Sequence, residues 1–275
     1  MPELPEVETI AGGLASVACG RTIMEAVVRT PGIVPGTQEA LSRRVAGRTV
    51  LGVRRRAKLL IMDLAGDLHL VFHLKMTGRV WVTHPAVDPN KHVHVVFLLD
   101  NGDRVFFEDQ RKFGYCRLFS GSEIEAWPFY AGLGPEPLKI APQEFAALFS
   151  GRTARIKSLL LDQGVLAGIG NIYADESLFR TSIHPRTRAS EIPVPRLMEL
   201  HRNLQAVLRE AIDAGGSSFR DYRDAYGQPG QFQERFSVYG RKNQPCERCG
   251  TSLDTEKVAG RTSTFCRICQ PPPER

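Results

Sequence analysis

Four cysteines near the C-terminus constrain the fold of this chain more than any other feature. They form two Cys-x-x-Cys pairs with 16 residues between the pairs, and they are Cys246, Cys249, Cys266 and Cys269. This spacing favours a tetrahedral Zn²⁺ site over free thiols or a redox-active pair. Four thiolates leave no open coordination position, so we predict one structural zinc ion. The residues between the pairs, 251–265, would form a short hairpin with Arg261 near its tip.

Composition places the chain among ordinary globular proteins. It has 275 residues, 42% apolar and 24% charged, which is enough for about two domains. No apolar run approaches about 18 residues, and the N-terminus lacks the pattern of a secretory signal. Few cysteines, most of them in one metal-type cluster, are typical of a reducing compartment. We therefore expect a cytoplasmic protein in which Cys19 and Cys116 are buried small side chains.

The charge distribution indicates an anionic partner. The formal net charge is +6, and residues 41–60 contain basic side chains and no acid. These basic residues are Arg43, Arg44, Arg48, Arg54, Arg55, Arg56 and Lys58. An uncompensated basic stretch inside a folded domain favours a surface that follows phosphates.

The apolar pattern changes part-way along the chain. An amphipathic helix is predicted over 6–18, and strands follow from residue 20 to about 120. Two hairpins are predicted in this region, 58–64 with 68–74 and 92–99 with 104–108. Helical spacing begins later, at 145–149, 156–161, 172–179 and 195–214, and a long polar loop follows over 215–235.

We predict an α+β multidomain fold. Residues 1–128 form an N-terminal antiparallel β-sandwich, and the Pro- and Gly-rich segment 129–142 is a linker. Residues 143–235 form a helical domain that ends in the polar loop, and residues 236–271 form the zinc-binding hairpin.

The N-terminus admits two interpretations. Met1 precedes the small residue Pro2, so removal of the methionine would expose a prolyl secondary amine beside Glu3. Such an amine can act as a covalent catalyst. Alternatively, the Pro2–Glu6 stretch is only a rigid lead into the first helix, with its acids near the positive end of the helix dipole.

A set of motifs, in order along nearly the whole chain, resembles the family of bacterial formamidopyrimidine-DNA glycosylases. The motifs are MPELPEVET (1–9), RAK (56–58), HLKMTG (73–78), DQRKFG (109–114), IK (156–157), LLDQ (160–163), GIGNIYA (168–174), SSFRDY (217–222) and VYGR (238–241). The resemblance implies an N-terminal β-sandwich, a helix–two-turn–helix domain and a C-terminal zinc ribbon. It also implies a bifunctional enzyme of base excision repair that acts on double-stranded DNA as a monomer. Such an enzyme removes 8-oxoguanine and formamidopyrimidines and cleaves the abasic strand by β,δ-elimination.

The resemblance also implies catalytic roles. Pro2 would be the Schiff-base nucleophile, Glu3 the general acid and base, Lys58 a participant in β-elimination, and Arg261 a phosphate ligand used in δ-elimination. An α-amine near pKa 8 is far more often neutral at physiological pH than a lysine near 10.4, which suits an amine nucleophile. Glu6 matches a carboxylate near the pocket, although helix-start electrostatics would equally explain it.

The remaining matches concern DNA. Expected DNA contacts are His73, His92, Arg111, Arg152, Lys157, Asn171 and Tyr173, although His73 and His92 fit a structural role in paired strands as well. The residues expected to fill the gap left by an extruded base are Met76, Arg111 and Phe113. The loop expected to cover the lesion includes Ser217, Ser218, Phe219, Arg220 and Tyr222. Lys75, Gln110 and Lys112 depart from the usual family residues, which leaves lesion and partner-base preference open.

Three alternatives remain at this stage. One is an endonuclease VIII-like enzyme for oxidised pyrimidines, which Leu4 and the gap-filling set disfavour. A second is a zinc-ribbon DNA-binding protein without activity, which would have no need of Pro2, Glu3, Lys58 and Arg261. A third, more distant, is a basic RNA-binding protein.

Overall fold

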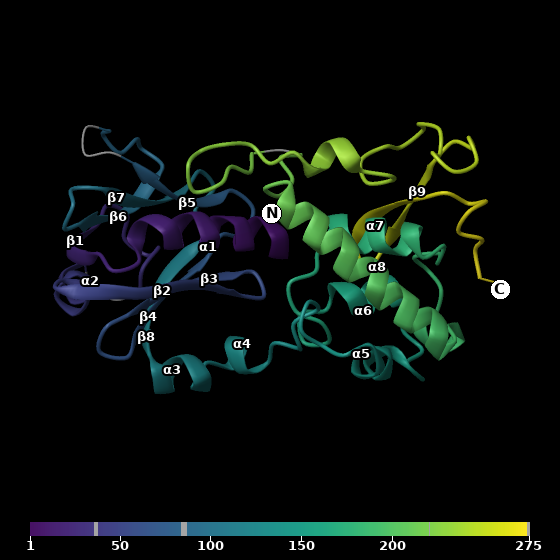
Figure 1. Ribbon diagram of the computed structural model, residues 1–275, viewed down its shortest axis with the longest axis horizontal. Coiled ribbons are helices and arrows are strands. Elements are labelled where there is room, and N and C mark those ends of the chain that lie inside the picture. The colour runs from purple at the N-terminus through teal and green to yellow at the C-terminus, as the bar shows by residue number, and fades with distance from the viewer. Residues whose placement is uncertain (36–37, 84–86, 220, 274–275) are drawn as a thin grey trace. The chain divides into compact units, whose positions relative to one another are not determined.

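A computed structural model describes residues 1–35, 38–83, 87–219 and 221–273 of the chain. They form two compact units (Figure 1). The first comprises Met1–Ala131 and Ala214–Gln231, and the second comprises Gly132–Asp213 and Phe232–Arg275. No helix among the described residues is both long enough and apolar enough to span a bilayer.

The first unit contains the predicted antiparallel sheet. Its strands are β1 (Thr22–Val28), β2 (Arg48–Arg56), β3 (Leu59–Leu64), β4 (Leu68–His73), β5 (Gly78–Thr83), β6 (Val93–Leu99), β7 (Arg104–Asp109) and β8 (Tyr115–Ser120). They follow the order β5-β7-β6-β1-β2-β3-β4-β8. Strand β1 pairs with β2 only through its first residues and with β6 along most of its length, with a register shift between Ile23 and Glu25. The sheet therefore divides at β1 into two halves of four strands.

The two halves share one apolar core, as the sandwich prediction requires. The ring of Phe72 on β4 lies 6.0 Å from that of Phe97 on β6 and 5.7 Å from that of Phe107 on β7. Helix α1 (Leu4–Ala18) adds Val7, Ile10 and Leu14 to the same core.

Three short helices complete this unit, namely α2 (Gln38–Val45), α3 (Gly121–Ala126) and α4 (Pro128–Ala131). The sequence predicted only strands between 20 and 120, so α2 was not expected. Few buried apolar side chains mark this helix, and its last turn is basic at Arg43 and Arg44. Cys116 is buried as expected, whereas Cys19 is exposed. The expectation for Cys19 was therefore wrong: it follows the last turn of α1 instead of facing the core.

The second unit is helical and ends in the predicted hairpin. Its helices are α5 (Pro142–Phe149), α6 (Ile156–Leu161), α7 (Asn171–Arg180), α8 (Val194–Asp213) and the short 3₁₀ turns η1 (Ala189–Glu191) and η2 (Phe232–Arg235). Strands β9 (Asp254–Val258) and β10 (Arg261–Phe265) pair antiparallel. The apolar stripe of α8 is buried at Leu197, Leu200 and Leu204, so it belongs to the core of this unit.

Candidate active site and metal centre

The N-terminal segment is buried and firmly hydrogen-bonded. Pro2 and Glu3 are both buried, and Glu3 precedes the first turn of α1. One carboxylate oxygen of Glu6 accepts the backbone N–H of Glu3 at 2.8 Å, and the other accepts the N–H of Ser217 at 2.8 Å. Burial and the Glu6 carboxylate raise the pKa of Tyr222, so its hydroxyl stays protonated and donates to the Glu6 carbonyl at 3.3 Å. Glu6 thus connects the residues expected to be catalytic with the loop expected to cover the lesion.

Lys58 lies on the turn between β2 and β3, where Ala57 adopts a positive φ of 53°. The Arg55 guanidinium donates to the Ala57 carbonyl at 3.0 Å and to the Glu8 carboxylate of α1 at 2.7 Å. This bridge attaches the turn to the first helix. Lys58 itself is only 7% exposed.

His73, at the end of β4, is held in its neutral form. Burial, followed by the charges of Lys75 and Lys58, lowers the pKa of His73 to about 3. Its Nδ1 accepts the backbone N–H of Lys75 at 3.1 Å. The ring proton therefore resides on Nε2, which is a hydrogen-bond donor. His92, half-buried directly before β6, accepts the N–H of Asp109 at its backbone carbonyl at 3.0 Å.

The three expected gap-filling residues lie on two adjacent loops. Residues 74–77 join β4 to β5 and carry Met76, and residues 110–114 join β7 to β8 and carry Arg111 and Phe113. Because β4 pairs with β8 and β5 with β7, the loops lie side by side. Met76 is 38% and Phe113 56% exposed, and the Arg111 guanidinium lies 4.7 Å from the Phe113 ring centre.

Within the loop expected to cover the lesion, Ser218 makes two hydrogen bonds to other residues of the same segment. Its hydroxyl donates to the Tyr222 carbonyl at 2.8 Å and accepts the Gly230 N–H at 2.9 Å. Phe219 is 46% exposed. Arg220, which the sequence analysis included in this loop, lies outside the described residues.

In the second unit, a buried ion pair joins α6 to α7, and both of its members bond to β10. The ammonium of Lys157 is fully buried, 2.6 Å from an Asp175 oxygen and 2.7 Å from the Ser263 hydroxyl. The second Asp175 oxygen accepts the N–H of Thr264 at 3.1 Å. Burial raises the pKa of Asp175, and the Lys157 charge opposes that effect. The network fixes the strand that begins at Arg261 against helix α7.

The other expected DNA contacts of this unit differ in accessibility. Arg261 and Arg152 are exposed, with Arg261 directly after the turn formed by Ala259 and Gly260. Asn171, at the start of α7, donates to the Thr262 carbonyl at 2.8 Å. Tyr173 is fully buried, and its ring stacks against that of Phe232 at 6.0 Å.

The four cysteines meet as predicted. Their sulfur atoms all lie within 4.8 Å of one another, and the Cys249–Cys266 and Cys246–Cys269 pairs are separated by 3.4 and 3.8 Å. A zinc ion with bonds of about 2.3 Å to four sulfurs needs separations of about 3.8 Å. The donor set therefore fits one structural zinc, which the four thiolates would enclose.

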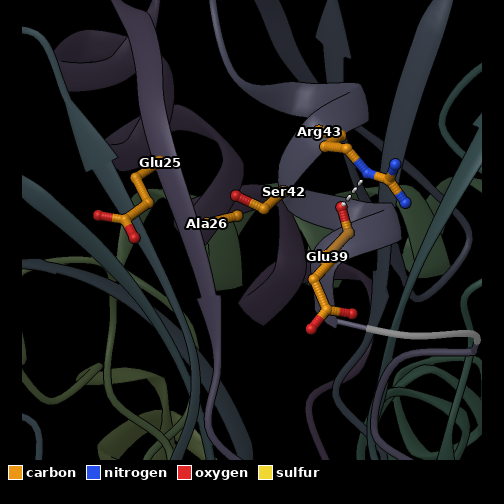
Figure 2. Close-up of a pocket in the computed structure, with 5 residues that line it drawn as sticks. All are labelled: Glu25, Ala26, Glu39, Ser42 and Arg43. Carbon is orange, nitrogen blue, oxygen red and sulfur yellow. Dashed lines mark hydrogen bonds between the residues drawn. The ribbon is translucent and has the colours of Figure 1, made fainter.

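A surface pocket of about 600 Å³ lies elsewhere on the first unit. Figure 2 shows the residues that line it, which are Glu25, Ala26, Glu39, Ser42 and Arg43. They belong to β1 and α2, and apart from Arg43 of the basic stretch none is an expected site residue. The Arg43 guanidinium donates to the Glu39 carbonyl at 3.2 Å, so one hydrogen-bond donor of the pocket wall is already bonded within α2.

Three family models match consecutive parts of the chain. The family model described as "Formamidopyrimidine-DNA glycosylase N-terminal domain" matches residues 1–116. The H2TH domain model of the same glycosylase matches 133–223, and the zinc finger model shared by FPG and IleRS matches 243–272. The chain belongs to the formamidopyrimidine-DNA glycosylase family.

Named members of the family match over nearly their whole length. The proteins of Chloroflexus aurantiacus and Bacillus subtilis are 43% and 41% identical, with 98% of this chain and 98% and 99% of those chains covered. Solved structures of Lactococcus lactis Fpg with DNA containing an abasic site or N7-benzyl-Fapy-dG have a TM-score of 0.91 and 33% identity. They cover 98% of this chain and 100% of the Lactococcus chain.

For this member of the glycosylase family, the structure adds three buried acids that the sequence analysis did not single out. They are Asp109, Asp175 and Glu176. The Glu176 carboxylate accepts the backbone N–H groups of Ser237, Val238 and Tyr239 at 2.8 to 3.0 Å. The available signal was the two consecutive acids in the predicted helix over 172–179, among its apolar residues Ile172, Ala174, Leu178 and Phe179, because buried carboxylates require specific partners.

Proposed function

We propose that this chain is a bifunctional DNA glycosylase and abasic-site lyase that excises oxidised purines, 8-oxoguanine and formamidopyrimidines, from double-stranded DNA. The observation that carries the proposal is the arrangement of the N-terminus. Pro2 and Glu3 are buried at the start of α1, and Glu6 fixes the Glu3 backbone. Family membership and the relatives solved with abasic-site and Fapy-dG DNA support the same reaction.

The nucleophile is the secondary amine of Pro2 after removal of Met1. Its lone pair attacks C1′ of the damaged nucleotide, and the glycosidic bond breaks with departure of the base. The sugar ring opens to an iminium that carries no N–H proton to lose, so it withdraws electrons and acidifies C2′. Loss of a C2′ proton expels the 3′ phosphate, and a second elimination expels the 5′ phosphate.

Glu3 serves as general acid and base for these proton transfers. Lys58 acts in the first elimination and Arg261 binds phosphate for the second. The Nε2–H of neutral His73 is suited to donate to a DNA phosphate, because its Nδ1 is already engaged. Further DNA contacts are assigned to His92, Arg111, Arg152 and Asn171. Lys157 and Tyr173 are fully buried, so they contribute to DNA binding through the neighbours that they position.

Met76, Arg111 and Phe113 fill the space left by the extruded base, and the loop that begins at Ser217 covers the lesion.

The chain divides into four parts. Residues 1–128 are the catalytic domain, 129–142 the linker, 143–235 the DNA-binding domain and 236–271 the zinc-binding part. The enzyme acts as a monomer on chromosomal DNA in the cytoplasm.

The test is excision of 8-oxoguanine by two variants, Pro2→Gly and Glu3→Gln. Both should lose base excision while they keep zinc and a cooperative unfolding transition. Glu25→Gln, a surface acid on β1 in the same unit, is the matched control and should retain full activity. Full excision by Pro2→Gly or by Glu3→Gln would contradict the mechanism.

A further inference from the structure

The buried carboxylate of Asp109 lies beneath the two loops that carry Met76, Arg111 and Phe113. Asp109 ends β7 and is 0% exposed. Its Oδ1 accepts the Thr77 hydroxyl at 2.5 Å and the Arg111 N–H at 3.1 Å, and its Oδ2 accepts the Gly114 N–H at 2.7 Å. One side chain therefore binds both loops at once, the first through a hydroxyl and the second at two backbone positions.

Asp109 is itself held on its backbone side. Its N–H donates to the His92 carbonyl at 3.0 Å, and its carbonyl lies 2.7 Å from Nε2 of His94. Because a carbonyl only accepts, Nε2 of His94 carries the ring proton and Nδ1 accepts from the Thr30 hydroxyl at 2.7 Å. His94 is 0% exposed, so strand β6 provides a rigid base for the carboxylate.

The loops have little room to adjust around this carboxylate. A Cβ at Gly114 would lie 2.9 Å from the His73 carbonyl oxygen and 3.1 Å from Oδ2 of Asp109. Lys75 and Lys112, which directly precede Met76 and Phe113, have positive φ values of 50° and 57°. Non-glycine residues keep such backbone conformations only where their surroundings impose them, and the Asp109 bonds supply that constraint.

We propose that Asp109 is a positioning residue that holds Met76, Arg111 and Phe113 at one fixed spacing, so that all three enter the duplex together when the damaged base leaves it. The inference rests on the proposed function, because the three side chains must fill the vacated space. The fixed spacing removes the need to order two separate loops at the moment of base extrusion.

The first variant is Asp109→Asn, which keeps the shape of the side chain. An amide offers one oxygen, so its NH₂ group must face either the Gly114 N–H or the donors at Thr77 and Arg111. We expect excision of 8-oxoguanine from duplex DNA to fall by roughly 10- to 100-fold. Strand cleavage at a preformed abasic site in single-stranded DNA, which needs no gap filling, should change by less than about 3-fold. Asp63→Asn, which removes a carboxylate paired with Arg54 and His69 in the same sheet, is the matched control.

A second pair of variants distinguishes a loss of positioning from a loss of folding. Thr77→Val removes only the hydroxyl and should lower duplex excision by several-fold, whereas Thr77→Ser keeps the hydroxyl and should retain wild-type excision. A 2-aminopurine reporter next to the lesion should show slower base extrusion in Asp109→Asn and Thr77→Val only. An equal loss on duplex and single-stranded substrates, or equal activities of Thr77→Val and Thr77→Ser, would overturn the positioning role. If the wild-type protein itself excises no 8-oxoguanine, the proposed function fails instead.

Discussion

Replacing Asp175 by alanine should destabilise the second unit by about 3–5 kcal/mol, the usual cost of removing one partner of a buried ion pair. The ammonium of Lys157 is 0% exposed and lies 2.6 Å from the carboxylate, so bulk water does not replace the lost partner. The Thr264 N–H also loses its acceptor at 3.1 Å, and an unsatisfied buried donor costs about 1–3 kcal/mol. The Ser263 hydroxyl and Thr262 carbonyl still face the ammonium and offset part of the loss.

A double-mutant cycle with Lys157→Met measures the coupling. Urea unfolding with zinc present, followed by far-UV circular dichroism, reports mainly on the helices of this unit. The double variant should be more stable than Asp175→Ala alone, because replacing both charges with apolar groups removes the unpaired buried cation. Asp254→Ala, a half-exposed acid 3.9 Å from Arg267, is the control and should cost less than about 1 kcal/mol. The reasoning fails if Asp175→Ala matches this control, or if the two single losses simply add.

Three further predictions concern other parts of the site. Cys249→Ser should abolish zinc retention and lower DNA binding and excision, because the hairpin that carries Arg261 loosens. The β-sandwich should keep its unfolding transition. Normal turnover by the zinc-free variant would refute the role of the hairpin. Glu6→Ala should cost about 2–6 kcal/mol, because it removes an acceptor from two backbone N–H groups, and a urea midpoint unchanged from wild type would contradict the assigned bonds. The depressed pKa of His73 stabilises the fold above the unfolded-state pKa near 6.5, and this contribution is lost as the pH falls toward 3. The stability advantage of wild type over His73→Gln should therefore shrink between about pH 7.5 and about pH 5, and a constant difference would show that His73 does not titrate as a buried neutral ring.

Local features of the fold were predictable from sequence because their causes are local. The cysteine pairs bind a metal through short loops, so spacing alone predicts their meeting. The hairpins from β3 to β4 and from β6 to β7 follow from alternating strands around turn residues. Pro128, just before the predicted linker, and Pro142, at its end, occupy the first positions of α4 and α5, where a missing N–H costs nothing.

The parts that escaped prediction depend on partners distant in sequence. Asp175 meets Thr264, 89 residues away, and Glu6 meets Ser217, 211 residues away. No spacing rule connects such pairs, because only the packed units bring them together. Helix α2 was not predicted for a different reason. Among its side chains that the structure describes, only Leu41 and Val45 are buried apolar residues, and its arginines suggest a binding surface.

The most direct test of the central claim is borohydride trapping on two labelled duplexes, followed by mass spectrometry of the cross-linked peptide. One duplex carries 8-oxoguanine opposite cytosine and the other an oxidised pyrimidine. Reduction converts the iminium to a stable amine, so the account predicts an adduct at Pro2 that forms more strongly with 8-oxoguanine. A stronger adduct with the pyrimidine would overturn the substrate assignment. No adduct on either duplex, from zinc-loaded protein that lacks Met1, would contradict the enzymatic mechanism and favour a DNA-binding protein.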